Sequence, residues 1–162
     1  TENDAELAEC RSRFKEQLLP QMAADGSFPQ ELRRTKPYCY SEFNLDQMTM
    51  LCYLISTPQD DLWHFVLPNG ATLQKGAEFM YPYIADKSKW PPNAKVRAQD
   101  VMWWQYWPVR SCTWLLAGLE YNEPKYIDLW KSLDANPTNE EVLRNLPIRQ
   151  PVIWAADPEV EN

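Results

Sequence analysis

The spacing of apolar residues along this chain favours helices and gives little support to a sheet. Leu7, Cys10, Phe14 and Leu18 recur three or four residues apart, with charged residues between them. This spacing is typical of an amphipathic helix. No segment shows a convincing alternation of apolar and polar residues, which is the pattern of a half-buried strand. We therefore expect an all-α protein whose helices pair as antiparallel hairpins.

Turn residues and prolines divide the chain into expected elements. A first helix is expected over residues 4–24, ended or kinked at Pro20. Residues 27–40 contain two prolines and little helical periodicity, so we expect extended chain there. Ser41 is a plausible N-cap for a helix to about residue 56, which is apolar on most sides and should be buried. Glycine turns are expected at residues 25–27 and 68–70.

Five more elements are expected from about residue 72 onward. An aromatic helix should begin at Asp100 and place Trp103 and Trp107 on one face. The tail, residues 147–162, is proline-rich and should wrap as an extended strap. The other expected helices begin at about Thr72, near Pro124, and after a capping box that runs from Thr138 to Glu141.

Length and charge limit the classes of function. A chain of 162 residues is expected to form a single domain, or part of a larger one. The net charge is −7, but seven acids lie in residues 1–9 and 157–161, and the remaining 16 acids match 16 bases. No long basic tract favours nucleic acid, and no run of 18 apolar residues favours a membrane span. The acidity of the two ends need not repel an anionic substrate.

Cysteine and histidine usage argues against a metal centre. The four cysteines are scattered without metal-ligand spacing, and there is one histidine. We expect no zinc site and no cofactor. The cysteines are interpreted mainly as small buried groups, although their even number keeps a secreted, oxidised protein open. Thr1 begins directly on a helical pattern without a signal peptide, as expected of a mature or trimmed chain, or of an excised fragment.

Residues 25–44, DGSFPQELRRTKPYCYSEFN, combine cations with tyrosines. Arg34 and Lys36 lie close to Tyr40 in the sequence. Chemistry on an anionic sugar needs cations to hold a carboxylate and a nearby group to move a proton. A tyrosine titrates near pH ~10, so it acts as a base near neutrality only when cations or hydrogen-bond donors stabilise the phenolate.

Each of these residues also has a structural interpretation. Tyr40 could be an aromatic core residue at a helix start, and an arginine is most often part of a salt bridge. Arg33 and Arg34 are adjacent in expected extended chain, so they should point to opposite sides. One should face the cleft, and the other should pair with an acid such as Glu31. Tyr38 should face the same side as Tyr40 and either line a sugar subsite or fill the core.

Two further groups of residues also have a structural and a functional interpretation. Trp103 and Trp107 are either core residues or flat faces for a pyranose ring. For Glu42 and Asn44, in the expected first helical turn, capping is the favoured role.

Residues 25–45 closely resemble a block of the alginate lyase superfamily, the helical-toroid lyases of polysaccharide lyase families 5 and 38. Residues 61–63, Asp-Leu-Trp, also look like the family pattern. The resemblance covers roughly residues 5–135. It implies helical hairpins that form part of an incomplete (α/α) toroid, and cleavage of uronate polysaccharides by β-elimination. Alginate is the first expected substrate and glucuronan the second.

The resemblance also implies roles for single residues. In the family an arginine precedes a tyrosine by six or seven residues, which points to Arg34 and Tyr40 as carboxylate clamp and proton-transfer group, with Arg33 competing for the first role. The residues expected to contact substrate around them are Arg33, Lys36, Tyr38, Glu31, Trp103 and Trp107.

One part of the family site has no counterpart here. The family uses an Asn-His pair, whereas the single histidine, His64, lies in a stretch that matches a structural segment. We therefore expect this chain to correspond to the C-terminal half of a toroid, with the N-terminal half as its partner in another segment or chain. A secreted or periplasmic enzyme is expected. The alternative is a helical domain that binds an acidic glycan without chemistry.

Overall fold

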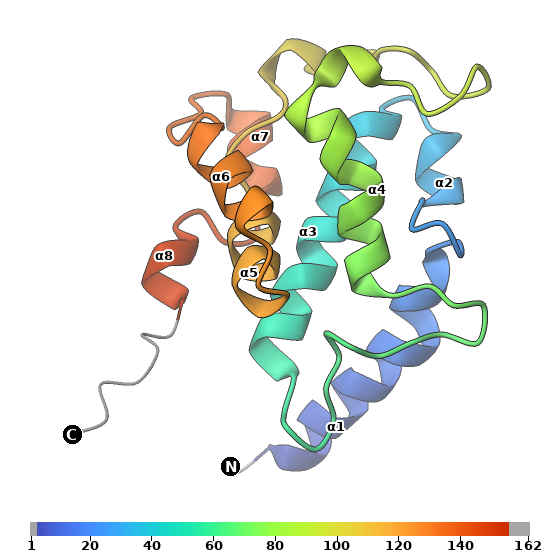
Figure 1. The fold of residues 1–162 in the computed structure, drawn as a ribbon, viewed down its shortest axis with the longest axis vertical. Coiled ribbons are helices and arrows are strands. Elements are labelled where there is room, and N and C mark those ends of the chain that lie inside the picture. Colours follow the sequence, from blue (N-terminus) through green and yellow to red (C-terminus); the bar gives the residue numbers. More distant parts are fainter. Residues whose placement is uncertain (1–2, 156–162) are drawn as a thin grey trace.

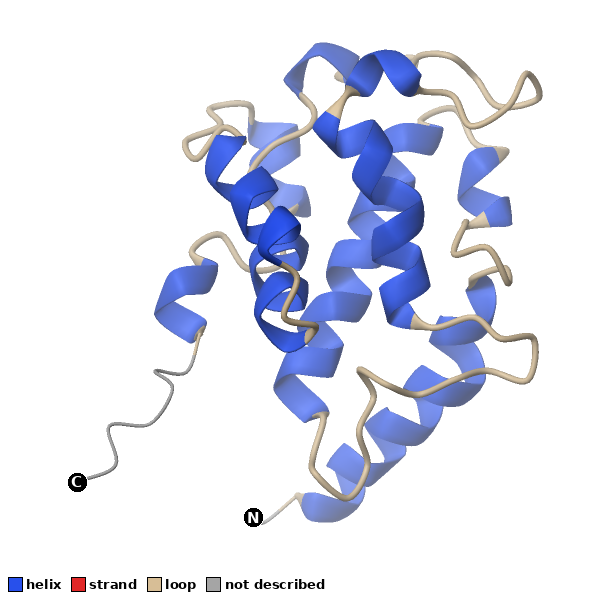
Figure 2. Ribbon diagram, viewed as in Figure 1, coloured by secondary structure: helices blue, strands red, loops and turns tan. Residues whose placement is uncertain are grey.

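The computed structural model describes residues 3–155, which are helical and contain no β-strand (Figure 2). Helices α3 and α4 lie side by side and antiparallel, and α5 and α6 form a second pair that packs against α3 through α5 (Figure 1). The expected all-α class is therefore confirmed. The helices are α1 (Asp4–Arg13), α2 (Pro29–Leu32), α3 (Pro37–Ile55), α4 (Leu73–Ala85), α5 (Cys112–Glu120), α6 (Pro124–Ser132), α7 (Glu140–Asn145) and α8 (Pro151–Trp154). Within the described residues, no helix is both long and apolar enough to cross a membrane.

Helix α3 is the central element of the core. It buries Leu45, Met48 and Cys52, as the sequence predicted. The predicted start at Ser41 is wrong, because the helix begins four residues earlier at Pro37, whose fixed φ suits a first helical position. The Ser41 hydroxyl instead donates a hydrogen bond to the backbone carbonyl oxygen of Pro37, at 2.7 Å.

A residue far away in the sequence caps the start of α3. The Asp100 carboxylate accepts hydrogen bonds from the backbone N–H groups of Tyr38 and Cys39, each at 3.0 Å. These two groups have no partner within the helix, so a buried carboxylate satisfies them in place of a local N-cap. The backbone N–H of Val101 also donates to the carbonyl oxygen of Thr35, at 3.1 Å. The segment around Asp100 is thus attached to the turn before α3.

Two other predictions about the first 40 residues need correction. The predicted helix over 4–24 is regular only in α1 and then continues as a π-helix over Phe14–Leu18 and a 3₁₀ turn over Leu19–Gln21, which contains Pro20. The segment 27–40 is not extended throughout, because it contains α2 and the first turn of α3. Both prolines that favoured extended chain, Pro29 and Pro37, stand at helix starts.

The predicted glycine turns are confirmed. Gly26 and Gly70 have φ values of +86° and +84°, which favour glycine. A Cβ atom at Gly26 would lie 2.0 Å from the carbonyl oxygen of Lys75. Glycine therefore allows the turn before α2 to lie directly against the first part of α4.

The predicted aromatic helix from Asp100 is wrong. Trp103 has a φ of +62°, and a single 3₁₀ turn, Trp104–Tyr106, follows it. The ammonium group of Lys87 contacts the backbone carbonyl oxygens of Trp104 and Trp107. A lysine therefore binds carbonyls that a continuous helix would have used internally. Trp103 and Trp107 do not share a helix face.

Smaller differences occur elsewhere. Asn139, not Thr138, caps α7, because its side chain accepts hydrogen bonds from the backbone N–H groups of Glu141 and Val142. The predicted extended tail contains the short helix α8, and its residues 156–162 lie outside the described part. Three of the four cysteines are buried free thiols, as predicted, whereas Cys10 is exposed.

Helix α3 also buries a carboxyl group without a hydrogen-bond partner in the described chain. Neither oxygen of Glu42 is hydrogen-bonded, so the predicted capping role is wrong. Burial, reinforced by the charge of Asp46, raises the pKa of Glu42 well above its ordinary value of 4.5; Asp100 acts in the same direction and Lys87 opposes it. Burial likewise raises the pKa of Asp46 and of Asp100.

The pH dependence of stability should report on Glu42. Because its pKa is raised on folding, the folded protein binds more protons than the unfolded chain above pH 4.5, and the free energy of unfolding falls as pH rises. Glu42→Gln is neutral at every pH, so it should be more stable than the wild type at about pH 8 and show a smaller difference between about pH 5 and pH 8. Urea unfolding at both values tests this expectation. Glu78→Gln, at an exposed position of α4, should leave the difference unchanged; an unchanged difference in Glu42→Gln would contradict the assignment.

Candidate functional site

Tyr40 lies in the first turn of α3, beneath two cations. The turn between α2 and α3 folds back over this part of the helix. It places the guanidinium of Arg34 3.6 Å from the centre of the Tyr40 ring and the ammonium of Lys36 4.8 Å from it. Cations at these distances are attracted to the ring face. The structure thus brings together the arginine and the tyrosine that the sequence singled out.

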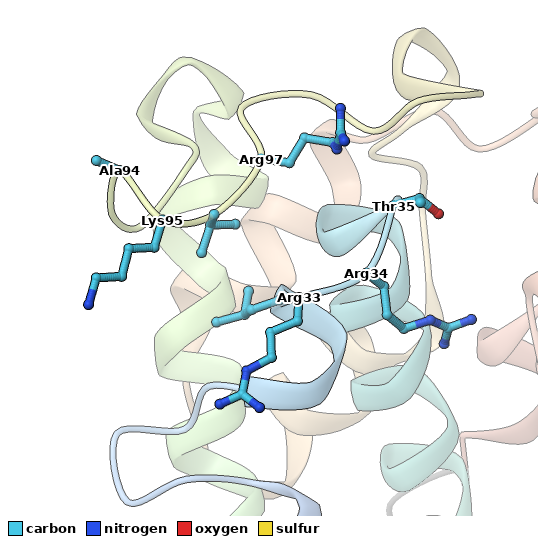
Figure 3. A pocket seen from close by; sticks show the side chains of 8 residues that line it. Arg33, Arg34, Thr35, Ala94, Lys95 and Arg97 are labelled. Atoms are coloured by element: carbon cyan, nitrogen blue, oxygen red, sulfur yellow. The ribbon is translucent and has the colours of Figure 1, made fainter.

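Arg34 is held in this position by a neighbouring acid. Its Nη1 atom donates to Oε2 of Glu31 at 2.8 Å, in an ion pair whose Arg34 side chain remains half exposed. The sequence predicted that one arginine would face the cleft and the other would pair with an acid such as Glu31, but Arg34, the favoured carboxylate clamp, is itself the partner of Glu31. Residues 31–34 follow a helical turn, which makes Glu31 and Arg34 neighbours three residues apart. Arg33 is exposed and points in a different direction from Arg34 (Figure 3).

Lys36 lies between Tyr40 and residues 100–108, which we call the tryptophan loop. Its side chain is buried, with 9% of the residue exposed. Its ammonium lies 3.9 Å from the centre of the Trp103 ring and 3.8 Å from Oε1 of Glu141. Tyr40, Lys36 and Trp103 therefore form a continuous stack beside α7. Trp103 is partly exposed, and its aromatic face lies next to the Lys36 ammonium.

A hollow of about 590 Å³ opens beside this stack. Arg144 and Glu141 stand at it and form an ion pair, with Nη2 3.0 Å from Oε1. The hydrogen bond from Arg144 lowers the pKa of Glu141. The same pair raises the pKa of Arg144, and the charge of Tyr40 contributes in the same direction. The hollow is lined by Trp103, Thr138, Asn139, Glu140, Glu141 and Arg144.

Sequence reasoning missed the contribution of α7 to the site. Glu141 was assigned only as part of a capping box, and Arg144 was not considered. The signal available was the charged i, i+3 pair of Glu141 and Arg144 on a short helix. Such pairs usually mark a solvated surface, so only the fold could place this one beside Tyr40.

Two residues predicted to contact substrate are core residues instead. Tyr38 is fully buried, its hydroxyl donates to the carbonyl oxygen of Tyr83 at 3.1 Å, and burial raises its pKa. Residues two apart share a side in a strand but lie about 200° apart around a helix, so Tyr38 and Tyr40 face different ways. Trp107 is also buried. Neither side chain is placed to line a sugar subsite in this structure.

The histidine lies away from the tyrosine. Nδ1 of His64 is 2.7 Å from Oδ2 of Asp61 and 4.0 Å from Oε1 of Glu120, in the loop that follows α3. Tyr40 is near the opposite end of this helix of 19 residues, which spans about 28 Å. The described residues contain no cluster of three His, Cys, Asp or Glu side chains that could hold a metal ion.

Comparisons with known proteins place the chain in a family. The sequence pattern of the family described as "Alginate lyase" matches residues 1–90, which include α1 to α4 and the pair Arg34 and Tyr40. A crystal structure of an alginate lyase from Bacteroides ovatus superposes with a TM-score of 0.67 and 24% sequence identity. The match covers 86% of this chain and 36% of that one, so the chain spans about a third of that protein's length. This likeness concerns the fold. No curated protein matches the sequence.

Proposed function

Because the chain belongs to the alginate lyase family, we propose that it carries the arginine and tyrosine part of a polysaccharide lyase site that cleaves a uronate polymer by β-elimination. The observation that supports this function best is the position of the Arg34 guanidinium, 3.6 Å from the centre of the Tyr40 ring. A carboxylate bound to Arg34 would lie next to a phenol. The reaction needs the carboxylate clamp and the proton-transfer group to act on the same sugar.

Arg34 is proposed as the clamp for the uronate carboxylate. A guanidinium can donate two parallel hydrogen bonds to a carboxylate. One terminal nitrogen of Arg34 is occupied by Glu31, and the side chain is half exposed, which leaves other N–H groups for a ligand. Neutralising the carboxylate acidifies the adjacent C–H, because negative charge that develops on the carboxylate in the transition state is stabilised.

Tyr40 is proposed as the group that moves the proton. The phenolate oxygen removes the proton from the carbon beside the carboxylate. The electron pair of that C–H bond forms the new carbon–carbon double bond as the C–O bond to the leaving sugar breaks, and the phenol gives its proton to the leaving oxygen. Lys36 and Arg34, which lie against the ring, provide positive charge where this chemistry needs it.

The surroundings of the pair support an anionic sugar as the ligand. Trp103 offers a partly exposed aromatic face beside the hollow, with the Lys36 ammonium over its ring, and Arg144 lines the hollow together with Glu140 and Glu141. We propose alginate as the first substrate to test and glucuronan as the second. We also propose that the protein acts outside the cytoplasm, as a secreted or periplasmic enzyme, because polymers of this kind are extracellular.

Part of the site is proposed to come from outside this chain. The family resemblance calls for an Asn-His pair, and the single histidine of the sequence lies in the loop after α3, beside Asp61 and Glu120 of α5. We infer that an N-terminal half, in a preceding segment or a second chain, completes the site. The same observation favours one competing function, an acidic-glycan-binding domain without catalysis.

The purified chain of 162 residues should therefore show no eliminative activity by itself. Ultraviolet absorbance from the new carbon–carbon double bond, followed after addition of alginate or glucuronan, measures this directly. Activity should appear when the completing segment is present. Robust turnover by the chain alone, verified free of any partner, would show that the site is complete without it. Binding without product in the assembled protein would establish the competing function.

A further inference from the structure

A second group of cations adjoins Arg34. It surrounds a hollow of about 420 Å³ between the α2–α3 turn and the loop after α4. Four of its eight lining residues are cationic and none is acidic. We call it the cationic hollow. It is lined by Leu32, Arg33, Arg34, Thr35, Ala94, Lys95, Val96 and Arg97.

Three of the four cations have no charged partner in the described chain. Arg33, Lys95 and Arg97 are exposed, and none of them forms an ion pair with an acid of residues 3–155. Figure 3 shows these side chains extending in different directions, with Lys95 toward the lower left, Arg33 toward the bottom and Arg97 toward the top of the view. In a protein with a net charge of −7, such a local excess of positive charge attracts anions.

The loop that carries Lys95 and Arg97 is fixed to the core. Nε1 of Trp90 donates to the backbone carbonyl oxygen of Arg97 at 3.0 Å, and Val96 is buried. Trp90 itself packs edge-on against Tyr38, with ring centres 5.2 Å apart. The backbone that carries these two cations is thus fixed before any ligand arrives, so binding needs to order only their side chains.

We propose that the cationic hollow binds a second carboxylate of a polyuronate, on a sugar beyond the one held by Arg34. This inference rests on the proposed function. Arg34 borders the hollow and also lies over Tyr40, so one chain of sugars can pass from the tyrosine to the loop. A polyuronate carries a carboxylate on each uronate, and the arginines of the hollow can bind carboxylates with paired hydrogen bonds.

Binding to this surface has two measurable consequences. Affinity should increase with oligomer length, because a longer oligomer reaches both the Arg34 site and the hollow. It should also weaken as salt is added, because the contacts are exposed charges. Lys95 and Arg97 carry the effect, and neither is part of the proposed chemistry at Tyr40.

The test uses a loop variant and a control with the same change in charge. Lys95→Gln/Arg97→Gln removes two exposed side chains, while the backbone groups that fix the loop remain. Arg13→Gln/Lys125→Gln removes an exposed arginine from α1 and an exposed lysine from α6. Titration calorimetry with uronate dimer and hexamer, at low and high salt, gives the affinities. Thermal unfolding of both variants confirms that they fold.

The loop variant should bind the hexamer about tenfold more weakly than the wild type and lose most of the affinity difference between hexamer and dimer. The control should keep that difference. Equal hexamer affinities of loop variant and wild type would overturn the second-carboxylate site and leave the Arg34–Tyr40 site in place. If the wild type binds no uronate oligomer, the proposed function fails as well. Loop-dependent binding of a sulfated glycan alone, with no binding of polyuronate, would also overturn the proposal.

Discussion

Replacing Tyr40 with phenylalanine in the assembled enzyme should lower the turnover rate by about 10²–10⁴-fold, the usual contribution of general acid–base catalysis. The phenyl ring keeps its contacts with Arg34 and Lys36, so the affinity for a uronate oligomer should stay close to that of the wild type. A loss in turnover with unchanged affinity places the hydroxyl in the chemical step. Steady-state rates and calorimetric affinities on one defined oligomer measure the two effects.

Tyr38→Phe is the matched control for this change. It removes a hydroxyl two residues away, which donates to the carbonyl oxygen of Tyr83 in the core. We expect this variant to be less stable to urea, because a buried acceptor loses its donor, and to turn over substrate at the wild-type rate once folded. If Tyr40→Phe retained a tenth or more of the wild-type rate, another group would carry the proton.

Arg34→Ala should reduce both affinity and turnover. A charge-assisted hydrogen bond to a ligand carboxylate contributes about 1.5–3 kcal/mol, so the affinity for a short uronate oligomer should fall by about ten- to a hundredfold. Turnover should fall further, because the clamp also stabilises the charge that develops in the transition state. Binding and rate measurements on the assembled enzyme, with a uronate dimer and a longer oligomer, separate the two losses.

Arg33→Ala is the comparison for this prediction. Arg33 points away from Arg34 (Figure 3) and borders the cationic hollow. Its removal should therefore weaken the binding of long oligomers and leave the turnover rate of a bound substrate near that of the wild type. Were Arg33→Ala the more damaging change for a dimer, the carboxylate clamp would lie one residue earlier than we propose.

Local sequence patterns predicted the elements that local forces determine. The apolar faces of α3 and α4 are visible in the sequence, because burying them is the main source of helix stability in a folded domain. The start of α6 at Pro124 and the turns at Gly26 and Gly70 were also predictable. Each depends on the backbone preference of a single residue.

Two features of the fold depend on contacts between residues far apart in the sequence, and sequence patterns did not predict them. The start of α3 depends on Asp100, and the path of the tryptophan loop depends on Lys87, whose ammonium binds the carbonyl oxygens of Trp104 and Trp107. A pattern search along the chain cannot detect a cap 62 residues away. Tyr38 was predicted to lie in the site for a related reason. Residues 38 and 40 were expected in extended chain, where side chains two residues apart share a side, but they lie in a helix.

The candidate site also contains residues that the sequence predicted and residues that only the fold brings together. Arg34 and Tyr40 were predicted because they are close in the sequence and match a family pattern. Arg144 and Glu141 were missed because α7 reaches Tyr40 only in the folded protein. Lys36 was chosen correctly as a neighbour of Tyr40, but its position between Tyr40 and Trp103 depends on the backbone of the tryptophan loop.

The cap on α3 has a consequence for how the site forms during synthesis. Residues 1–90 contain Arg34 and Tyr40, but the carboxylate that receives the N–H groups of Tyr38 and Cys39 belongs to Asp100. A nascent chain emerging from the ribosome would expose the arginine and tyrosine before their helix end is secured. Contacts between distant residues form slowly, because the intervening loop must close first. Arg34 and Tyr40 should therefore become ordered only after the tryptophan loop has been translated and has docked.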